Sequence, residues 1–228
     1  MKNMLLSVAW PIWVLFLVSS LFFVLYPEVD IMVTSLFYSE AEGFFLKPSW
    51  WVKILYDSVK FVIITTLLVA IALWLWNRFS VKTVGAMTGK KVGYLMLVLA
   101  LGPGLIVNWV FKENWGRARP AHTEIFGGDK TFVPAFVFSD QCETNCSFSC
   151  GHASGAYFVI ALALLARRHQ PFWMTLAIVY GSAVGLARIV AGGHFFSDVV
   201  VSFFIVYIVA KMLHYRMFDA ESDEKSAA

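Results

Sequence analysis

Charged side chains are scarce in this chain of 228 residues. Lys, Arg, Asp and Glu make up only 14% of it, whereas apolar residues make up 59%. A soluble domain usually carries about 25% charged residues and less than half apolar ones. The composition therefore excludes an ordinary soluble domain and predicts a membrane protein. The basic residues are scattered at segment ends, so the net charge of +3 predicts no nucleic-acid partner.

Internal repeats and flexible linkers are also absent, which predicts one membrane domain over residues 1–218 and a polar, disordered cytoplasmic tail at 219–228. A helix needs ~20 apolar residues to cross the hydrocarbon core. Six segments come near that length, which predicts an all-α bundle of six transmembrane helices. No small-residue cleavage site follows the first of them, so we expect it to be retained. The segments are 5–26, 58–76, 92–111, 153–166, 172–187 and 198–213.

The basic residues of the short loops set an orientation. Loops 77–91 and 167–171, Lys2 and the C-terminal end carry an excess of Lys and Arg on one side of a six-span arrangement, which the positive-inside rule assigns to the cytoplasm. Both termini are then cytoplasmic. Residues 112–120 break the rule, because they are basic and fall on the outer side, so they need another explanation.

The first candidate site motif lies in that basic segment. Lys112 and Arg119 are seven residues apart, two helical turns, and would share a face if the helix continued to Pro120. An arginine fork and a lysine charge suit the oxygens of a phosphate. The alternative is that these cations merely reach the lipid headgroups.

The second motif immediately precedes the fourth apolar segment and contains Ser149, Cys150, Gly151 and His152. Gly151 allows the backbone to approach a ligand closely, and free amides at a helix N-terminus favour an anion. His152 could donate a proton to a leaving oxygen. The alternative role for His152 is that of a polar anchor at the membrane interface.

The third motif follows the fifth apolar segment and runs from Arg188 through Gly192 and Gly193 to His194 and Asp198. His194 and Asp198 are four residues apart, one helical turn. A carboxylate bonded to one ring nitrogen leaves the other free to act as a nucleophile. A purely structural His–Asp pair is the alternative. Ionisable groups at a membrane edge are costly, however, which favours a functional role.

All three motifs fall on the outer side in the six-span arrangement, and together they predict phosphoryl transfer through a histidine. Their order and spacing over residues 92–215 resemble the type 2 phosphatidic acid phosphatase family, which shares its core with the vanadium haloperoxidases. The resemblance implies a lipid phosphatase with six membrane helices that needs no metal or other cofactor.

The resemblance also implies roles for individual residues. His194 would attack phosphorus to form a phosphohistidine, Asp198 would orient it, and His152 would protonate the leaving group. The phosphoryl oxygens would be bound by Lys112, Arg119, Arg188 and the backbone around Gly151. Two positions depart from the family pattern, because Cys150 and Ala187 stand where the family has hydroxyl groups. We expect Ser149 to compensate for Cys150.

The motifs look most similar to a bacterial branch of the family that dephosphorylates lipid A, which implies the periplasmic face of the inner membrane. Undecaprenyl diphosphate, phosphatidylglycerophosphate and phosphatidic acid remain alternative substrates. A non-catalytic binder or transporter of phospholipids is a hypothesis of another class. The presence of both His194 and Asp198 disfavours it.

The chain has only three cysteines, and none forms a CxxC pair typical of zinc sites. A cysteine phosphatase would need an arginine six residues after its thiol, where this chain has Ala156. Cys142 and Cys146 are either a disulfide that closes a small turn or two free thiols, and Cys150 belongs to the phosphate cradle. The loop 121–148 is expected to cover the site.

Overall fold

The computed structural model describes residues 8–166 and 168–220, and all regular elements in this part of the chain are helical. Two isolated bridges, Ser39 with Gly43 and Thr123 with Lys130, are the extended pairings found there. The predicted all-α class is confirmed. The helices are α1 (Trp10–Leu25), α2 (Glu28–Ser35), α3 (Trp50–Phe79), α4 (Gly89–Leu99), η2 (Ala100–Lys112), η3 (Pro120–His122), η4 (Glu124–Phe126), α5 (Gly151–Tyr157), α6 (Val159–Leu165), α7 (Gln170–Val190), α8 (Phe196–His214) and η5 (Tyr215–Asp219).

Four continuous helices are long and apolar enough to cross a membrane, which makes this a membrane protein. They are Trp50–Phe79, Gly89–Lys112, Gln170–Val190 and Phe196–Asp219. The first expected span corresponds to α1, but α2 turns away from it by 84°, and together they form a fifth, broken span or a re-entrant segment. Pro27 lies at the break. Lys2 and the tail from residue 221 lie outside the described residues.

The expected fourth span is a short central helix. Gly151–Leu165 is shorter than the four continuous helices and, at 1.5 Å per residue, is about 22 Å long, less than the ~30 Å hydrocarbon core. Most of its residues are buried, and α3, α7, α8 and η2 all pack against it. Its N-terminus, with Gly151, therefore lies among the other helices of the bundle and not at the periphery of the bundle.

The helix that carries Lys112 is widened along its second half. Pro103 lies inside η2 and has no N–H, and the backbone adopts wide, π-type turns there. The Asn108 side chain donates a hydrogen bond to the Pro103 carbonyl at 2.7 Å. The helix ends shortly after Lys112, so the condition for a shared helical face is not met and Arg119 lies in a loop.

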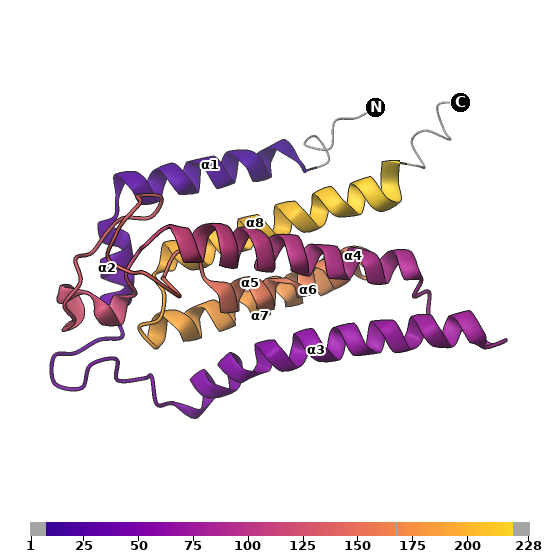
Figure 1. Cartoon of the computed structure of the whole chain (residues 1–228), viewed down its shortest axis with the longest axis horizontal. Coiled ribbons are helices and arrows are strands. Elements are labelled where there is room, and N and C mark those ends of the chain that lie inside the picture. Colours follow the sequence, from indigo (N-terminus) through magenta and orange to yellow (C-terminus); the bar gives the residue numbers. More distant parts are fainter. Residues whose placement is uncertain (1–7, 167, 221–228) are drawn as a thin grey trace.

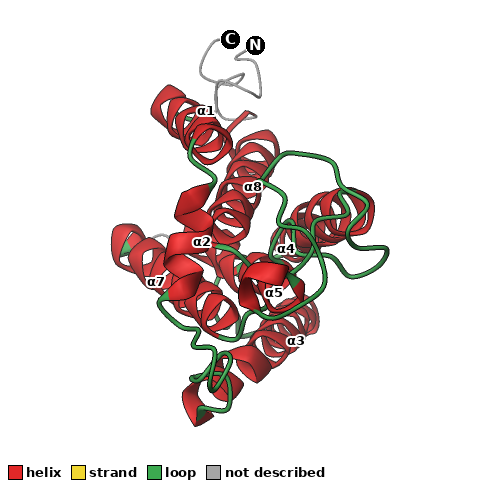
Figure 2. Ribbon diagram, turned by 90° about the vertical axis from the view of Figure 1, so that its left-hand side faces the viewer, coloured by secondary structure: helices red, strands yellow, loops and turns green. Residues whose placement is uncertain are grey.

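The three motifs gather at one end of the bundle. Figure 1 shows the loop after η2, the start of α5, the end of α7 and the start of α8 at this end, opposite the α3–α4 connection and η5. Figure 2 looks onto this end and shows α5 surrounded by α3, α4, α7 and α8. The fold thus brings three motifs that are separate in the sequence to one place.

Candidate active site

Three cations and a histidine lie together at this end. Lys112 interacts electrostatically with Arg119 and Arg188, and all three interact with His152. Burial and the neighbouring Arg188 hold the pKa of Arg119 below its ordinary value. Within residues 8–166 and 168–220, none of the three cations forms an ion pair with a carboxylate. Such a concentration of positive charge suits an anionic ligand.

The His194 ring is buried and held from one side. Its Nδ1 lies 2.8 Å from the Ser147 carbonyl oxygen and 3.5 Å from Asp198 Oδ2. The nearest partner is therefore the carbonyl and not the carboxylate that the sequence predicts. Either acceptor keeps the proton on Nδ1, and the Nε2 lone pair is then available.

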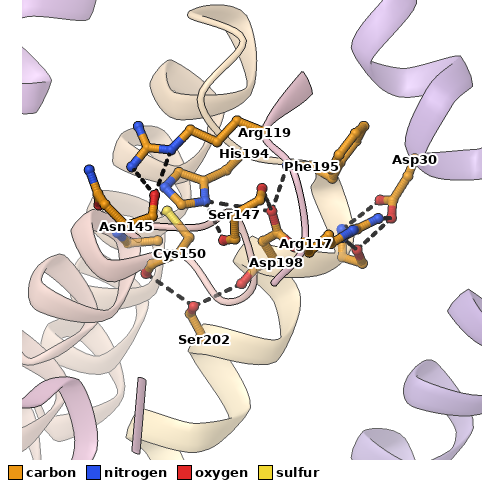
Figure 3. Close-up of polar contacts among 12 residues, drawn as sticks. Asp30, Arg117, Arg119, Asn145, Ser147, Cys150, His194, Phe195, Asp198 and Ser202 are labelled. Atoms are coloured by element: carbon orange, nitrogen blue, oxygen red, sulfur yellow. Dashed lines mark hydrogen bonds and ion pairs between the residues drawn. The ribbon is translucent and has the colours of Figure 1, made fainter. Parts of the chain in front are cut away.

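Asp198 is farther from His194 because other donors occupy its oxygens (Figure 3). Asp198 Oδ2 accepts from the Phe195 N–H at 2.8 Å and from the Ser147 hydroxyl at 2.5 Å, and Oδ1 accepts from Arg117 Nη1 at 2.6 Å. Ser147 thus contacts His194 through its carbonyl and Asp198 through its side chain. The two residues are oriented together through this shared neighbour.

Arg117 is a buried residue of the site that the sequence analysis did not single out. Its Nη1 bonds to Asp198, its Nη2 donates to Asp30 Oδ2 at 2.7 Å, and its Nε donates to the Val133 carbonyl at 2.8 Å. Burial opposes its charge, but Asp198 and Asp30 outweigh that cost and raise the pKa of Arg117 above its ordinary value. The sequence signal that could have pointed to Arg117 was the unexplained excess of basic residues in segment 112–120, on the outer side.

Asp30 was also missed, because an acidic residue in an outer loop is unremarkable in sequence. It lies in the first turn of α2 and accepts hydrogen bonds from both the N–H, at 2.8 Å, and the hydroxyl of Ser197. A carboxylate at a helix N-terminus stabilises it. Asp30 therefore fixes the start of α8, where Asp198 lies.

The loop before α5 orients other site residues through its backbone. Cys142 and Cys146 are joined by a disulfide, with their Cα atoms 5.6 Å apart. The Asn145 carbonyl accepts from Arg119 Nε at 3.0 Å and Nη2 at 2.8 Å, and the Cys146 N–H donates to the Lys112 carbonyl at 3.3 Å. This short segment therefore contacts two of the three cationic residues.

Cys150 caps α5 inside the site. Its sulfur accepts from the Ala153 N–H at 3.4 Å, and its own N–H donates to the Asp198 carbonyl at 3.3 Å. The thiol is buried and within hydrogen-bonding reach of the His194 ring. The Cys150 side chain thus lies next to the His194 imidazole, where the sequence places the predicted phosphate cradle.

Two other predicted binders carry unsatisfied polar atoms. Ser149 Oγ and Arg188 Nε are buried with no hydrogen-bond partner in the described part of the chain. A Cβ at Gly193 would lie 2.2 Å from Arg188 Nη2, so a larger residue there would displace the guanidinium. A Cβ at Gly151 would lie 2.7 Å from Asn108 Oδ1 and 3.6 Å from Lys112 Nζ. Glycine at these positions lets the backbone and the cations lie close together.

His152 lies at the open side of the site. Its ring stacks on that of Tyr56, with centroids 4.1 Å apart and planes at 26°. Beside it runs a groove of about 1020 Å³ between α3 and η2, lined mainly by apolar side chains, with Lys112 and Gly151 also in its wall. The arrangement therefore places the group of cations at an apolar groove, as an amphiphilic phosphate ester requires.

The family of the chain follows from comparison with known proteins. Residues 91–222 match the PAP2 superfamily, and the chain belongs to this family. The match covers all three motifs, so the resemblance to the type 2 phosphatidic acid phosphatases is confirmed.

The names of curated relatives give a particular activity and not only a family. Over 208 residues the chain is 37% identical to the lipid A 4'-phosphatase of Francisella tularensis subsp. novicida (strain U112), which covers 87% of this chain and 90% of the relative. It is 34% identical over 128 residues to the lipid A 4'-phosphatase of Rhizobium leguminosarum, which covers 56% of this chain and 55% of the relative. No solved structure matches the chain.

Proposed function

We propose that this protein is a lipid A phosphatase that hydrolyses the 4'-phosphate monoester through a phosphohistidine. The observation that carries the proposal is a buried histidine, His194, with its Nδ1 bonded to a carbonyl and with three cations nearby. In the described part of the chain, none of these cations forms an ion pair with a carboxylate. The relatives named lipid A 4'-phosphatase support the substrate. The apolar groove that meets the cations supports a lipid.

The first step is attack on phosphorus by the Nε2 lone pair of His194. The P–N bond forms as the ester P–O bond breaks, and His152 donates a proton to the departing sugar oxygen. Asp198 and the Ser147 carbonyl hold the ring and stabilise its positive charge. The product of this step is a phosphohistidine and the free alcohol of the lipid.

The second step is hydrolysis of the phosphohistidine. His152, now neutral, takes a proton from water, the oxygen attacks phosphorus, and the P–N bond breaks to release inorganic phosphate. Throughout, Lys112, Arg119 and Arg188 offset the charge on the phosphoryl oxygens. The free Ser149 Oγ and the amides around Gly151 supply further donors.

We further propose six membrane passes, with α1–α2 and α5–α6 completing the four continuous helices, in a bacterial inner membrane. Both termini would be cytoplasmic and the active site periplasmic. This orientation is supported by the basic residues at the end of the bundle opposite the site. They are Arg78, Lys82, Lys90 and Lys91, around the α3–α4 connection (Figure 1).

Phosphate release from purified protein tests the function. Wild type and His194→Ala are assayed on lipid A, undecaprenyl diphosphate, phosphatidylglycerophosphate and phosphatidic acid. We expect lipid A to be preferred and His194→Ala to be inactive. A matched control is His214→Ala, because His214 also has an aspartate nearby, 3.3 Å from Asp219, but lies at the C-terminal end of α8, whereas His194 immediately precedes that helix. It should retain activity.

Several outcomes would contradict the proposal. Release by His194→Ala at the wild-type rate would exclude the phosphohistidine mechanism. Preference for another lipid would overturn the substrate but not the chemistry. Binding of phosphorylated lipid without any release by wild type would favour the non-catalytic binder.

A further inference from the structure

Tyr56 is an aromatic residue at the site that belongs to none of the three motifs. It lies in the second turn of α3 and lines the apolar groove. Its ring stacks on His152, and the guanidinium carbon of Arg188 lies 5.0 Å from its centroid. Its charge interaction with Arg119 places it near a second cation. One side chain of α3 thus touches groups from both the second and the third motif.

The stacking matters because His152 has no other directional contact. Within the described residues, no hydrogen bond involves the His152 side chain, whereas His194 has one. An imidazole on the wall of an open groove is otherwise free to rotate about its two side-chain torsions. A flat ring at 4.1 Å restricts the plane of the imidazole, and therefore the direction in which its nitrogens point.

We propose that Tyr56 is a positioning residue that fixes the ring plane of His152 for proton transfer to the leaving oxygen. This proposal rests on the role of His152 as the general acid in the proposed function. Proton donation requires hydrogen-bond geometry with the leaving oxygen. Because the aromatic ring carries the contact, the hydroxyl of Tyr56 is dispensable for it.

Two substrates separate this role from general damage to the site. The sugar alcohol of lipid A needs a proton to leave, whereas the nitrophenolate of 4-nitrophenyl phosphate leaves as a stable anion. Loss of a general acid therefore lowers kcat/KM for lipid A much more than for the aryl phosphate. Loss of phosphate binding or of the nucleophile lowers both alike.

The variants are Tyr56→Leu, which removes the ring, and Tyr56→Phe, which keeps it. We expect Tyr56→Leu to lower kcat/KM for lipid A by about 10- to 100-fold, the cost of a misplaced reacting group. On the aryl phosphate its loss should be at least several times smaller. Tyr56→Phe should resemble wild type on both substrates.

Tyr180→Leu is the control for helix packing. The Tyr180 hydroxyl lies 2.8 Å from the Ser58 hydroxyl and so joins α7 to α3 without touching His152. Any loss in this variant should be equal on the two substrates. The second readout is rescue by Tyr56→Phe, because it restores the ring that contacts His152 and not the hydroxyl.

The outcomes distinguish the two proposals. Equal losses on both substrates, or a failure of Tyr56→Phe to resemble wild type, would overturn the role of Tyr56 in positioning His152. Wild-type activity of Tyr56→Leu would also overturn it. If His152→Ala itself lost the two activities equally, the general acid of the proposed function would be wrong.

Discussion

The two histidines of the site differ in how they are held. His194 is 1% exposed and belongs to a buried network that runs through Asp198 and Arg117 to Asp30. His152 faces the groove and rests against a single aromatic ring. A nucleophile must present one nitrogen at a fixed place, whereas a general acid must meet a leaving group that arrives from the membrane. We call the network of His194, Asp198, Arg117 and Asp30 the buried half of the site. We call His152 and the ring that it contacts the open half. The difference suggests that the buried half supports both stability and activity, whereas the open half supports activity alone.

The largest expected effect comes from breaking the buried half with Arg117→Leu. This change leaves two buried carboxylates without their partner, which costs about 3–5 kcal/mol of unfolding free energy. Activity should fall to background, because Asp198 and His194 lose their orientation. Thermal unfolding in detergent, together with phosphate release, measures both losses. Arg119→Leu is the control, and an equal loss of stability there would contradict the distinction between the halves.

His152→Ala probes the open half. We expect kcat/KM on lipid A to fall by about 10²–10⁴-fold, the usual contribution of a general acid. The unfolding temperature should stay near that of wild type, because the ring makes no hydrogen bond within residues 8–166 and 168–220. A marked fall in unfolding temperature would assign His152 to the structural core.

Arg119→Lys tests a residue that belongs to neither half, and we expect a smaller loss of activity. Lysine keeps the charge but cannot donate two bonds to the Asn145 carbonyl from one planar group. Loss of one charge-assisted bond, worth about 1.5–3 kcal/mol, predicts a rise in KM of about 10-fold or more. Steady-state kinetics on lipid A measure it, and a fall in kcat with unchanged KM would assign Arg119 to the chemical step instead.

The smallest effect is expected from Cys150→Ser, which should retain or raise activity. Burial opposes protonation of His194, but the Cys150 thiol and the Asp198 carboxylate outweigh it and raise the pKa of His194 above its ordinary value. Only the neutral ring attacks phosphorus, so activity is lost as the pH falls below that pKa. Removing the thiol lowers the pKa and should move the acid limb of the kcat/KM profile to lower pH. A large loss of activity would give the thiol a role of its own.

Much of the helical framework could be predicted from the sequence, because each segment that lies in lipid must be apolar over a length set by the membrane. Residues 58–76 and 92–111 both fall within continuous helices. The bend after α1 and the central position of Gly151–Leu165 could not be predicted, because both depend on packing against the other helices. Hydropathy indicates whether a segment lies in an apolar environment, but not how its helix axis is oriented.

The site shows the same limit. The motif residues were singled out because their types and spacing suit phosphate chemistry, and the structure brings their three groups together. Arg117 and Asp30 are 87 positions apart, and only the fold brings them together. Tyr56 likewise lies on a helix without a motif, and an aromatic residue in a membrane helix has no distinctive pattern.

The segment 145–147 has a consequence for how the protein can evolve. It contacts Lys112, Arg119 and His194 through backbone atoms, so those contacts survive most changes of its own side chains. Asn145, with φ of +54°, restricts its position to residues that tolerate that conformation, such as Asn and Gly. The side chains of Cys146 and Ser147 have separate contacts, the disulfide to Cys142 and the hydrogen bond to Asp198. Conservation at positions 146 and 147 would therefore report the disulfide and the bond to Asp198, and not the backbone contacts to Lys112 and His194.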